Sequence, residues 1–330
     1  QVMRRCPASR FSLAVVLAVS ISVLLGASSA TWAAPTRLSL GTSSVGGSYF
    51  VWGGGWAKIM GEALKDVSIS VEVTGGPSTN IQLIQQRRMD VGFSSVGMAY
   101  SGWNGLDWAN GVKHNRIRAM FPMYASVLYT YALESKPIKS VYDFEGKHIT
   151  MGAPGSTSDV AGRDVLKTLG ITPRKISSLP TNTASDALRD GTADAGFAVS
   201  GVPAPFMLDL ETTHKIRHMG FSKADLDKIT KAFPYYATTT IPKGTYRHMD
   251  SDVSTLAFWN IAVADKDLPD DLVYRLVKAT FQNREAMIRI DPTAAQMLPE
   301  NIRFSTVPLH PGALKYYREI GIEIPAHLIP

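Results

Sequence analysis

The sequence predicts an α/β protein built of two similar lobes that are joined by two crossover strands. The first observation is a repeated phrase: residues 89–97 read MDVGFSSVG and residues 193–201 read ADAGFAVSG. The second is that short strands alternate with helices of about 10–15 residues before each copy, which is typical of parallel βαβ units with right-handed crossovers. One copy of the phrase in each lobe is the simplest explanation of the repeat.

The first 33 residues are expected to be a cleaved signal peptide. Three arginines among the first ten residues precede an apolar stretch over 11–25, and the small residues at 28–30 or 31–33 fit the cleavage rule. A retained membrane anchor is the alternative, although the stretch is shorter than the roughly 20 residues that a spanning helix needs. We therefore expect a mature protein that is exported to the periplasm.

The composition excludes several classes of function for the mature chain. The 34 basic and 28 acidic residues give a charge of +6, and loss of the leader's three arginines lowers it to about +3. So mild a charge, without a run of Lys or Arg, argues against nucleic acid as a partner. Cys6 is the only cysteine and leaves with the leader, so no disulfide, cysteine nucleophile or thiolate metal site is expected.

In the first half, apolar alternation at 38–40 predicts a strand, and the glycine- and serine-rich turn after it opens a helix that ends near Leu64. A second strand is predicted over 67–73. A short helix follows, which polar residues from Ser78 onward can cap. The strand after Asp90 closes this unit.

The second half has the same order of elements. A strand over 149–151 leads into the turn GAPGSTS and a helix over 159–169. A strand over 175–180 and a short helix that ends at Gly191 follow, because glycine is the usual residue after a helix end. The strand after Asp194 is the counterpart of the one that closes the first half.

The remaining chain does not repeat. It contains a strand over 254–264, a helix from Asp270 with apolar residues at helical spacing, and a short helix over 312–320. We assign these elements to the first lobe, so the chain crosses between lobes twice, near 124–133 and near 234–246. Both stretches are aromatic and β-branched, as extended strands are. The expected lobes are 36–128 plus 240–330, and 129–239.

A ligand site is expected where the two lobes face each other. Ligands of open α/β sheets bind beyond the carboxyl ends of the strands, and here those ends carry Gly, Ser, Thr and Asn just before a helix. A helix start offers free N–H donors and about half a positive charge, which suits a carboxylate or phosphate. The alternative is that each turn is an ordinary turn or N-cap. The candidate ligand-binding residues are Ser43, Ser44, Gly46, Gly47, Ser48, Tyr49, Gly75, Gly76, Ser78, Asn80, Ser94 and Ser95 in the first lobe, and Gly155, Ser156, Thr157 and Ser158 in the second.

No catalytic or metal site is expected. Asp90 and Asp194 could be catalytic carboxylates, but a capping role between helix and strand accounts better for their repetition. His214 and His218 lack the glutamate of an HExxH helix, and neither a GxSxG turn nor a phosphate-binding GxxxxGK(S/T) loop is present. We therefore expect a binding protein without a cofactor and without enzymatic activity.

Several segments, in their order along the chain, resemble the solute-binding subunits of TRAP transporters of the TAXI type. The resemblance extends over nearly all of the mature chain, and the number and order of the segments make it specific. The segments are LGTSSVGGSYFVWGG, VEVTGGPSTNIQLIQQRRMDVGFSSVGMAY, HITMGAPGSTSDV, ALRDGTADAGFAVSGVPAP, FPYYATTTIPKGTY, DLPDDLVYRLVKA and PLHPGALKYYRE.

The resemblance implies a type II periplasmic binding protein fold, in which a small ligand lies between the lobes. It also implies that the ligand is a glutamate-like amino acid or another carboxylate, and that TRAP membrane permease subunits, driven by an ion gradient, receive it. A periplasmic sensor component with the same fold is the alternative. An enzyme on this fold would need a proton-transfer pair that faces the cleft.

The family's site falls on the same turns, with one departure. Where the family commonly has Thr and Arg in the second-lobe turn, this chain has Ser158 and Asp159. An acid stabilises a helix N-terminus, but it competes with an anionic ligand. Asp159 therefore joins the candidate residues, and a monocarboxylate, or a zwitterion whose amine meets Asp159, fits better than a dianion.

Overall fold

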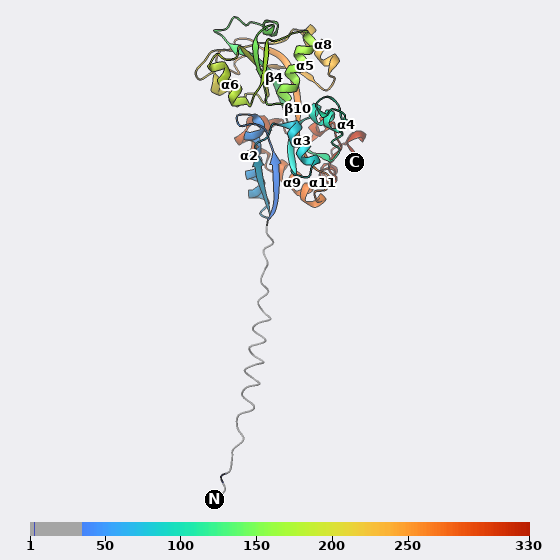
Figure 1. The fold of residues 1–330 in the computed structure, drawn as a ribbon. Helices are drawn as coiled ribbons and strands as arrows, with labels where there is room; N and C mark the ends of the chain where they lie inside the picture. Colours follow the sequence, from blue (N-terminus) through green and yellow to red (C-terminus); the bar gives the residue numbers. More distant parts are fainter. Residues whose placement is uncertain (1–2, 4–34) are drawn as a thin grey trace. The chain divides into compact units, whose positions relative to one another are not determined.

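One mixed sheet of ten strands runs through both lobes (Figure 1). In this computed structural model the strand order is β2-β1-β3-β10-β4-β7-β5-β6, with β8 paired to β4 and β9 paired to β10. The structure describes residue 3 and residues 35–330, so the predicted signal peptide lies, apart from Met3, outside the described residues. Within residues 35–330, no helix has both the length and the apolar character that crossing a membrane requires.

The first βαβ units form before the first crossing, in the predicted order. Strand β1 pairs in parallel with β2 and with β3, as strands joined by helical crossovers do. The elements are β1 (Thr36–Gly41), α2 (Ser48–Ala63), β2 (Val67–Glu72), α3 (Pro77–Gln85), β3 (Val91–Ser95), α4 (Val96–Asn104) and the 3-10 helix η1 (Asp107–Ala109).

The second set of βαβ units repeats this pattern, with β5 parallel to β6 and to β7. Its first helix, α5, begins where the Ser156 hydroxyl accepts a hydrogen bond from the Asp159 amide, and it ends at Gly170. The elements are β4 (Ile117–Leu133), η2 (Val141–Phe144), β5 (His148–Met151), α5 (Thr157–Leu169), β6 (Lys175–Ser178), α6 (Thr181–Arg189), β7 (Ala195–Ser200), α7 (Pro205–Leu210), β8 (Ile216–His218), α8 (Lys223–Ala232) and β9 (Ala237–Ile241).

The last part of the chain returns along a long strand and ends in helices. Helix α9 begins with Asp270 and Asp271, which favour a helix N-terminus, and it buries Leu272, Leu276 and Val277 on one face. The elements are β10 (Val253–Asp265), α9 (Asp270–Gln282), α10 (Arg284–Ile290), η3 (Pro292–Gln296), η4 (Pro299–Phe304), α11 (Pro311–Glu319) and η5 (Ala326–Leu328).

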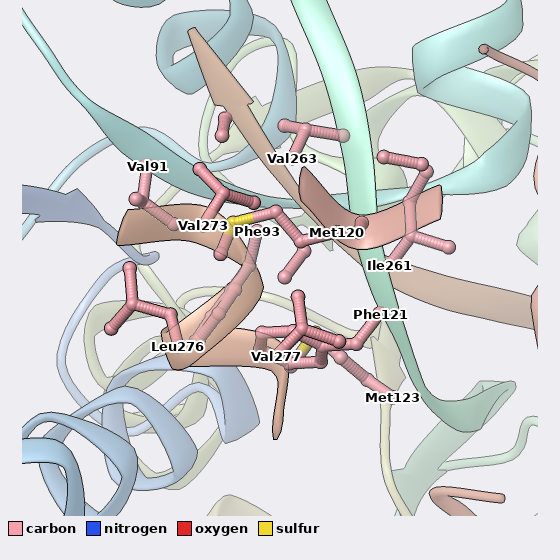
Figure 2. Packing of buried hydrophobic residues seen from close by; sticks show 14 of the residues in the cluster. Val91, Phe93, Met120, Phe121, Met123, Ile261, Val263, Val273, Leu276 and Val277 are labelled. Atoms are coloured by element: carbon pink, nitrogen blue, oxygen red, sulfur yellow. The ribbon is translucent and has the colours of Figure 1, made fainter. Parts of the chain in front are cut away.

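Separate clusters of buried apolar side chains define the two lobes. The first cluster combines β1, β3, α2, α9 and α11 with the N-terminal part of β4 and the C-terminal part of β10. Figure 2 shows Phe93, Phe121, Ile261 and Leu276 packed together in it. Two further clusters surround the C-terminal part of β4 and the N-terminal part of β10. We call the elements around the first cluster lobe 1 and those around the other two lobe 2.

The two crossover strands are β4 and β10, which pair antiparallel through both lobes. The sequence predicted the second crossing at 234–246, and there the structure differs. Strand β9, which comes from that segment, pairs with the lobe 2 part of β10, and Tyr246 is buried in the core of lobe 2. Aromatic and β-branched residues are equally typical of an edge strand, so composition did not separate the two possibilities.

The repeated aspartates make the same backbone contact in each lobe. Asp90 Oδ2 accepts a hydrogen bond from the Ser39 amide in β1 at 2.8 Å. Asp194 Oδ2 accepts one from the His148 amide at the start of β5 at 3.0 Å. Each aspartate thus ties its strand, β3 or β7, to the first strand of its βαβ repeat, β1 or β5. This contact is a structural role, and it explains why the phrase occurs twice.

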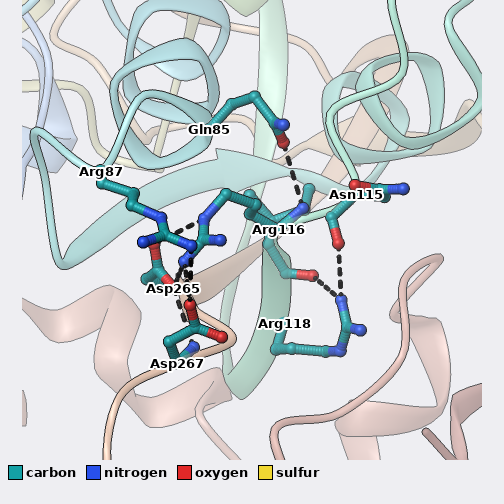
Figure 3. A network of polar contacts seen from close by, with 8 residues as sticks. Gln85, Arg87, Asn115, Arg116, Arg118, Asp265 and Asp267 are labelled. Carbon is teal, nitrogen blue, oxygen red and sulfur yellow. Dashed lines mark hydrogen bonds and ion pairs between the residues drawn. The ribbon is translucent and has the colours of Figure 1, made fainter.

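A buried ion pair joins the lobe 1 ends of β4 and β10 (Figure 3). Arg116 Nε donates to Asp265 Oδ2 at 3.0 Å, and Arg116 Nη2 donates to Asp265 Oδ1 at 2.5 Å. Asp267 accepts a further bond from Arg116 at 2.7 Å. Hydrogen bonding to Asp265 and Asp267 raises the pKa of Arg116. The pair holds the two crossover strands together at the end of lobe 1 that lies away from the crossing.

Candidate functional site

A cavity lies between the lobes, where the predicted turns meet. Its volume is about 50 Å³, which is room for a few water molecules or a small ligand group. Its lining is formed by Ser43, Ser44, Gly47, Ser48, Tyr49, Gly75, Gly76, Pro77, Tyr124, Ser126, Gly152, Ala153, Ser156, Thr157, Ser158, Thr181, Val199 and Ser200.

Four helix N-termini converge on this cavity, those of α2 and α3 from lobe 1 and those of α5 and α6 from lobe 2. The residues before α2, α3 and α6 are Gly47, Gly76 and Pro180, and none of them places a side chain on the first amides of its helix. Amides at a helix start have no partner within the helix and carry partial positive charge. The cavity therefore has the character of an anion site.

Two glycines allow the lobes to approach each other beside the cavity. Gly46 has a φ of 87°, and a Cβ there would lie 1.8 Å from Asn182 Oδ1 of lobe 2. Gly155 has a φ of 72°, and its Cβ would lie 2.2 Å from Ser78 Oγ of lobe 1. Because both the left-handed backbone and the space exclude a side chain, these turns fit the arrangement in which the lobes are in contact.

Hydroxyl groups form direct hydrogen bonds between the lobes around the cavity. Ser48 Oγ and Ser200 Oγ are 2.6 Å apart, and Ser95 Oγ and Thr157 Oγ1 are 3.1 Å apart. The Thr181 amide donates to Ser44 Oγ at 3.3 Å. The structure is therefore a closed form, in which both lobes contribute to one enclosed site.

The floor of the cavity comes from the crossover strands. Asn260, in β10, is buried, and its Nδ2 donates to the Tyr124 carbonyl and to Ser126 Oγ, both at 2.8 Å. The Tyr49 hydroxyl donates to Asn260 Oδ1 at 2.5 Å. Burial raises the pKa of Tyr49 and of Tyr124, so both phenols remain protonated. The site is thus connected directly to the strands about which the lobes would open.

Within the part of the chain that the structure describes, no charged side chain lines the cavity. Asp159, which the sequence offered as a partner for a ligand amine, lies outside the lining. Its Oδ1 accepts from Arg163 Nε at 3.0 Å and from Ser178 Oγ at 2.7 Å, and its Oδ2 accepts from the Gly155 amide. These bonds use the carboxylate to shape the turn before α5.

The cavity brings together most of the residues predicted from the sequence, and the others stand close by. Asn80 is buried and donates to the carbonyls of Gly41, Thr42 and Phe93, so it holds strand ends in place. The predicted residues in the lining are Ser43, Ser44, Gly47, Ser48, Tyr49, Gly75, Gly76, Ser156, Thr157 and Ser158. Those outside it are Gly46, Ser78, Asn80, Ser94, Ser95, Gly155 and Asp159.

Sequence reasoning missed the remaining lining residues. The start of α6, with Thr181, is the counterpart of the start of α3, whose residues were predicted, so the repeat itself could have identified it. Tyr124 and Ser126 lie in the predicted first crossing, where a strand between lobes must form the floor of a cleft. The missed residues are Pro77, Tyr124, Ser126, Gly152, Ala153, Thr181, Val199 and Ser200.

Comparison with known proteins gives one family and several structures of the same fold. The model of the NMT1-like family matches residues 40–321. The structure of MatC (Rpa3494) from Rhodopseudomonas palustris with bound malate is 13% identical, with 87% of this chain and 97% of that chain covered and a TM-score of 0.57. The structure of the periplasmic binding protein BugD is 15% identical, with 88% and 99% covered and a TM-score of 0.52. The likeness confirms the predicted fold of a two-lobed α/β binding protein.

Proposed function

Because the chain belongs to the NMT1-like family and has the fold of a two-lobed binding protein, we propose that it is an extracytoplasmic solute-binding protein. Its ligand is a small carboxylate that is captured between the lobes. The single observation that carries the proposal is that helix N-termini from both lobes meet on one uncharged cavity. An anion there touches both lobes at once, and so it links them.

The lining favours a carboxylate over an amino acid. The amides at the starts of α2 and α5 can donate to carboxylate oxygens, as can the surrounding Ser and Thr hydroxyls. An ammonium group would have no acidic side chain among the lining residues, because the Asp159 carboxylate is bonded to Arg163 and Ser178 instead. A buried charge without a partner is costly. We therefore propose a small organic acid without an ammonium group.

The proposed mechanism is conformational. An open form and the closed form interconvert by bending of β4 and β10, and the ligand favours the closed form because only there do both lobes touch it. Moving such an equilibrium from mostly open to mostly closed takes about 5.5 kcal/mol of differential affinity. A few charge-assisted hydrogen bonds of roughly 1.5–3 kcal/mol each can supply that amount.

The proposed partner is a membrane transporter. We propose that the closed form delivers its ligand to TRAP-type permease subunits, on the strength of the resemblance of the sequence to TAXI solute-binding subunits. The proposed site of action is the periplasm, in accord with the leader in the sequence. Cells that lack this protein should not take up the identified ligand. In cells that contain it, uptake should stop when the ion gradient is dissipated.

The binding function is tested with the mature chain and a panel of small acids. Titration calorimetry and thermal unfolding compare acetate, propionate, lactate, pyruvate, succinate and malate with the amino acids alanine and glutamate. We expect at least one acid to bind and to stabilise the fold, by about 2.7 kcal/mol at 100 times its Kd, and the amino acids to bind more weakly. Absence of binding by every acid, or chemical turnover of a bound compound, would contradict the proposal.

A further inference from the structure

Two tyrosines line the cavity, and they differ in the hydrogen bonding of their hydroxyl groups. Tyr49 donates its hydroxyl to Asn260 Oδ1. Tyr124 is fully buried and lines the cavity, yet its hydroxyl has no hydrogen-bond partner among residues 35–330. Ser48 and Ser126 lie beside this hydroxyl, but neither forms a bond of good geometry with it. A buried hydroxyl without a partner costs free energy, so its presence at a binding site calls for an explanation.

Two serine hydroxyls beside Tyr124 already accept hydrogen bonds from groups of the protein. Ser126 Oγ accepts from Asn260 Nδ2, so its own hydrogen is left to donate. Ser48 Oγ accepts from the Gly201 amide at 3.1 Å and pairs with Ser200. A group that reaches this floor therefore meets the Tyr124 hydroxyl and serine hydroxyls that can donate. The atom that satisfies them is an acceptor, such as an oxygen of a carboxylate or a carbonyl.

We propose that Tyr124 is a specificity-determining residue of this site, and that its hydroxyl donates a hydrogen bond to an oxygen atom of the bound ligand. The inference rests on the proposed function, because it needs a ligand in the cavity. Burial is the main reason why the pKa of Tyr124 is raised, with the nearby Tyr49 and Asp291 adding to it. The phenol is therefore a donor at every pH at which the protein would work. Because Tyr124 lies in β4, this bond attaches the ligand to a crossover strand.

The experiment compares Tyr124→Phe with two matched controls that also lose one phenol hydroxyl. Tyr49→Phe removes the donor of Asn260, and Tyr142→Phe removes an exposed hydroxyl that donates to Asp225 on the surface of lobe 2. The probe is the tightest-binding acid of the panel named above. Affinity is measured by calorimetry, and the stability of each ligand-free variant is measured by thermal unfolding.

We expect Tyr124→Phe to bind the probe about 10- to 100-fold more weakly than the natural chain, as loss of a hydrogen bond to a charged group predicts. Its ligand-free melting temperature should be unchanged or higher, because an unpaired buried hydroxyl has been removed. Tyr49→Phe should melt at a lower temperature, since Asn260 Oδ1 loses its donor. Tyr142→Phe should bind the probe with unchanged affinity.

The outcomes separate this inference from the function on which it rests. If the natural chain binds no acid of the panel, the proposed function fails, and this inference fails with it. If the natural chain binds the probe and Tyr124→Phe binds it within a factor of two, this inference alone is overturned. A Tyr124→Phe variant that loses stability in the ligand-free state would show a structural role and would also overturn it.

Discussion

Ser48 and Ser200 lie on opposite lobes, and their hydroxyl oxygens are 2.6 Å apart at the edge of the cavity. Ser48 stands at the first position of α2, and Ser200 ends β7. Ser48 Oγ also accepts a hydrogen bond from the Gly201 amide. The first turn of a lobe 1 helix is thus bonded to the end of a lobe 2 strand. This contact can exist only while the lobes are closed.

The two serines should differ in their effect on ligand binding. Ser48→Ala leaves the buried Gly201 amide without its acceptor, whereas Ser200→Ala removes only the hydroxyl that pairs with Ser48. We expect Ser48→Ala to weaken binding about 10- to 100-fold, in line with about 1–3 kcal/mol for an unpaired buried group. Ser200→Ala should weaken it about 5-fold. Calorimetric titration of both variants measures the order, and an effect of Ser200→Ala larger than that of Ser48→Ala would contradict the account.

Gly97 of α4 offers a way to hold the lobes apart without touching the ligand. A Cβ at Gly97 would lie 2.8 Å from the ring of Tyr235 in lobe 2. Gly97→Leu should therefore disfavour the closed form and reduce affinity by at least about 10-fold, because only the closed fraction binds tightly. Small-angle scattering with saturating ligand should show a larger radius of gyration than the natural chain has.

Gly54 provides the control for this substitution. It is an exposed helical glycine of α2, and a Cβ there would meet no atom within 4 Å. Gly54→Ala should raise the stability by about 0.5–1 kcal/mol through helix propensity and leave affinity unchanged. Equal affinities of Gly97→Leu and Gly54→Ala would argue against closure as the binding step.

The ion pair of Arg116 and Asp265 predicts a large loss of stability on truncation. Both side chains are nearly buried, with 10% and 9% of their surface exposed. Arg116→Ala leaves the Asp265 carboxylate buried without its partner, so we expect a loss of about 3–5 kcal/mol in the free energy of unfolding. Arg87 makes an exposed pair with Asp267 at 3.4 Å, and Arg87→Ala should cost at most about 1 kcal/mol. Denaturant unfolding of both variants checks the contrast, and equal losses would refute it.

Asp164 in α5 predicts a dependence of stability on pH. Burial raises its pKa from 3.8 to about 6, against the hydrogen bond that it accepts from the Tyr236 hydroxyl at 2.6 Å. Asp107 of lobe 1 adds to the rise, and Lys167 opposes it. The folded state favours the protonated carboxyl. The stability that the protonated Asp164 carboxyl provides is therefore fully present below about pH 4 and is lost as the pH rises through about 6. This loss lowers the free energy of unfolding by about 3 kcal/mol.

The neutral variant isolates this contribution. Asp164→Asn cannot ionise, so the difference in unfolding free energy between variant and natural chain should grow in favour of the variant between pH 4 and pH 7. Denaturant unfolding across this range measures the difference. A difference that is independent of pH would show that Asp164 titrates alike in the folded and unfolded chain.

The repeat predicted most of the fold, and several of the turns that it singled out line the candidate cavity. The two copies of the Asp-x-Gly-Phe phrase predicted two lobes of alternating strands and helices, because Asp90 and Asp194 perform the same backbone contact. The Gly and Ser turns predicted where the helix starts would face each other. Local sequence is sufficient for such features, since turns and caps depend on neighbouring residues.

Features that depend on contacts between distant segments could not be predicted in this way. The second crossing was wrong because the pairing of β9 with β10, and not its composition, decides that β9 is an edge strand. The Asp159 carboxylate turns toward Arg163 and Ser178, which lie in α5 itself and at the end of β6. The unpaired hydroxyl of Tyr124 results from the packing of both lobes on the crossover strands, which no short motif encodes.

If the amides at the starts of α2 and α5 bind one ligand together, the ligand should protect both sets of amides from hydrogen exchange. The measurement follows residues 43–52 and 153–161 by mass spectrometry while the tightest-binding acid is added. We expect exchange to slow in both segments with the same dependence on ligand concentration. Protection confined to one lobe, or found in neither segment while the acid is bound, would contradict this expectation.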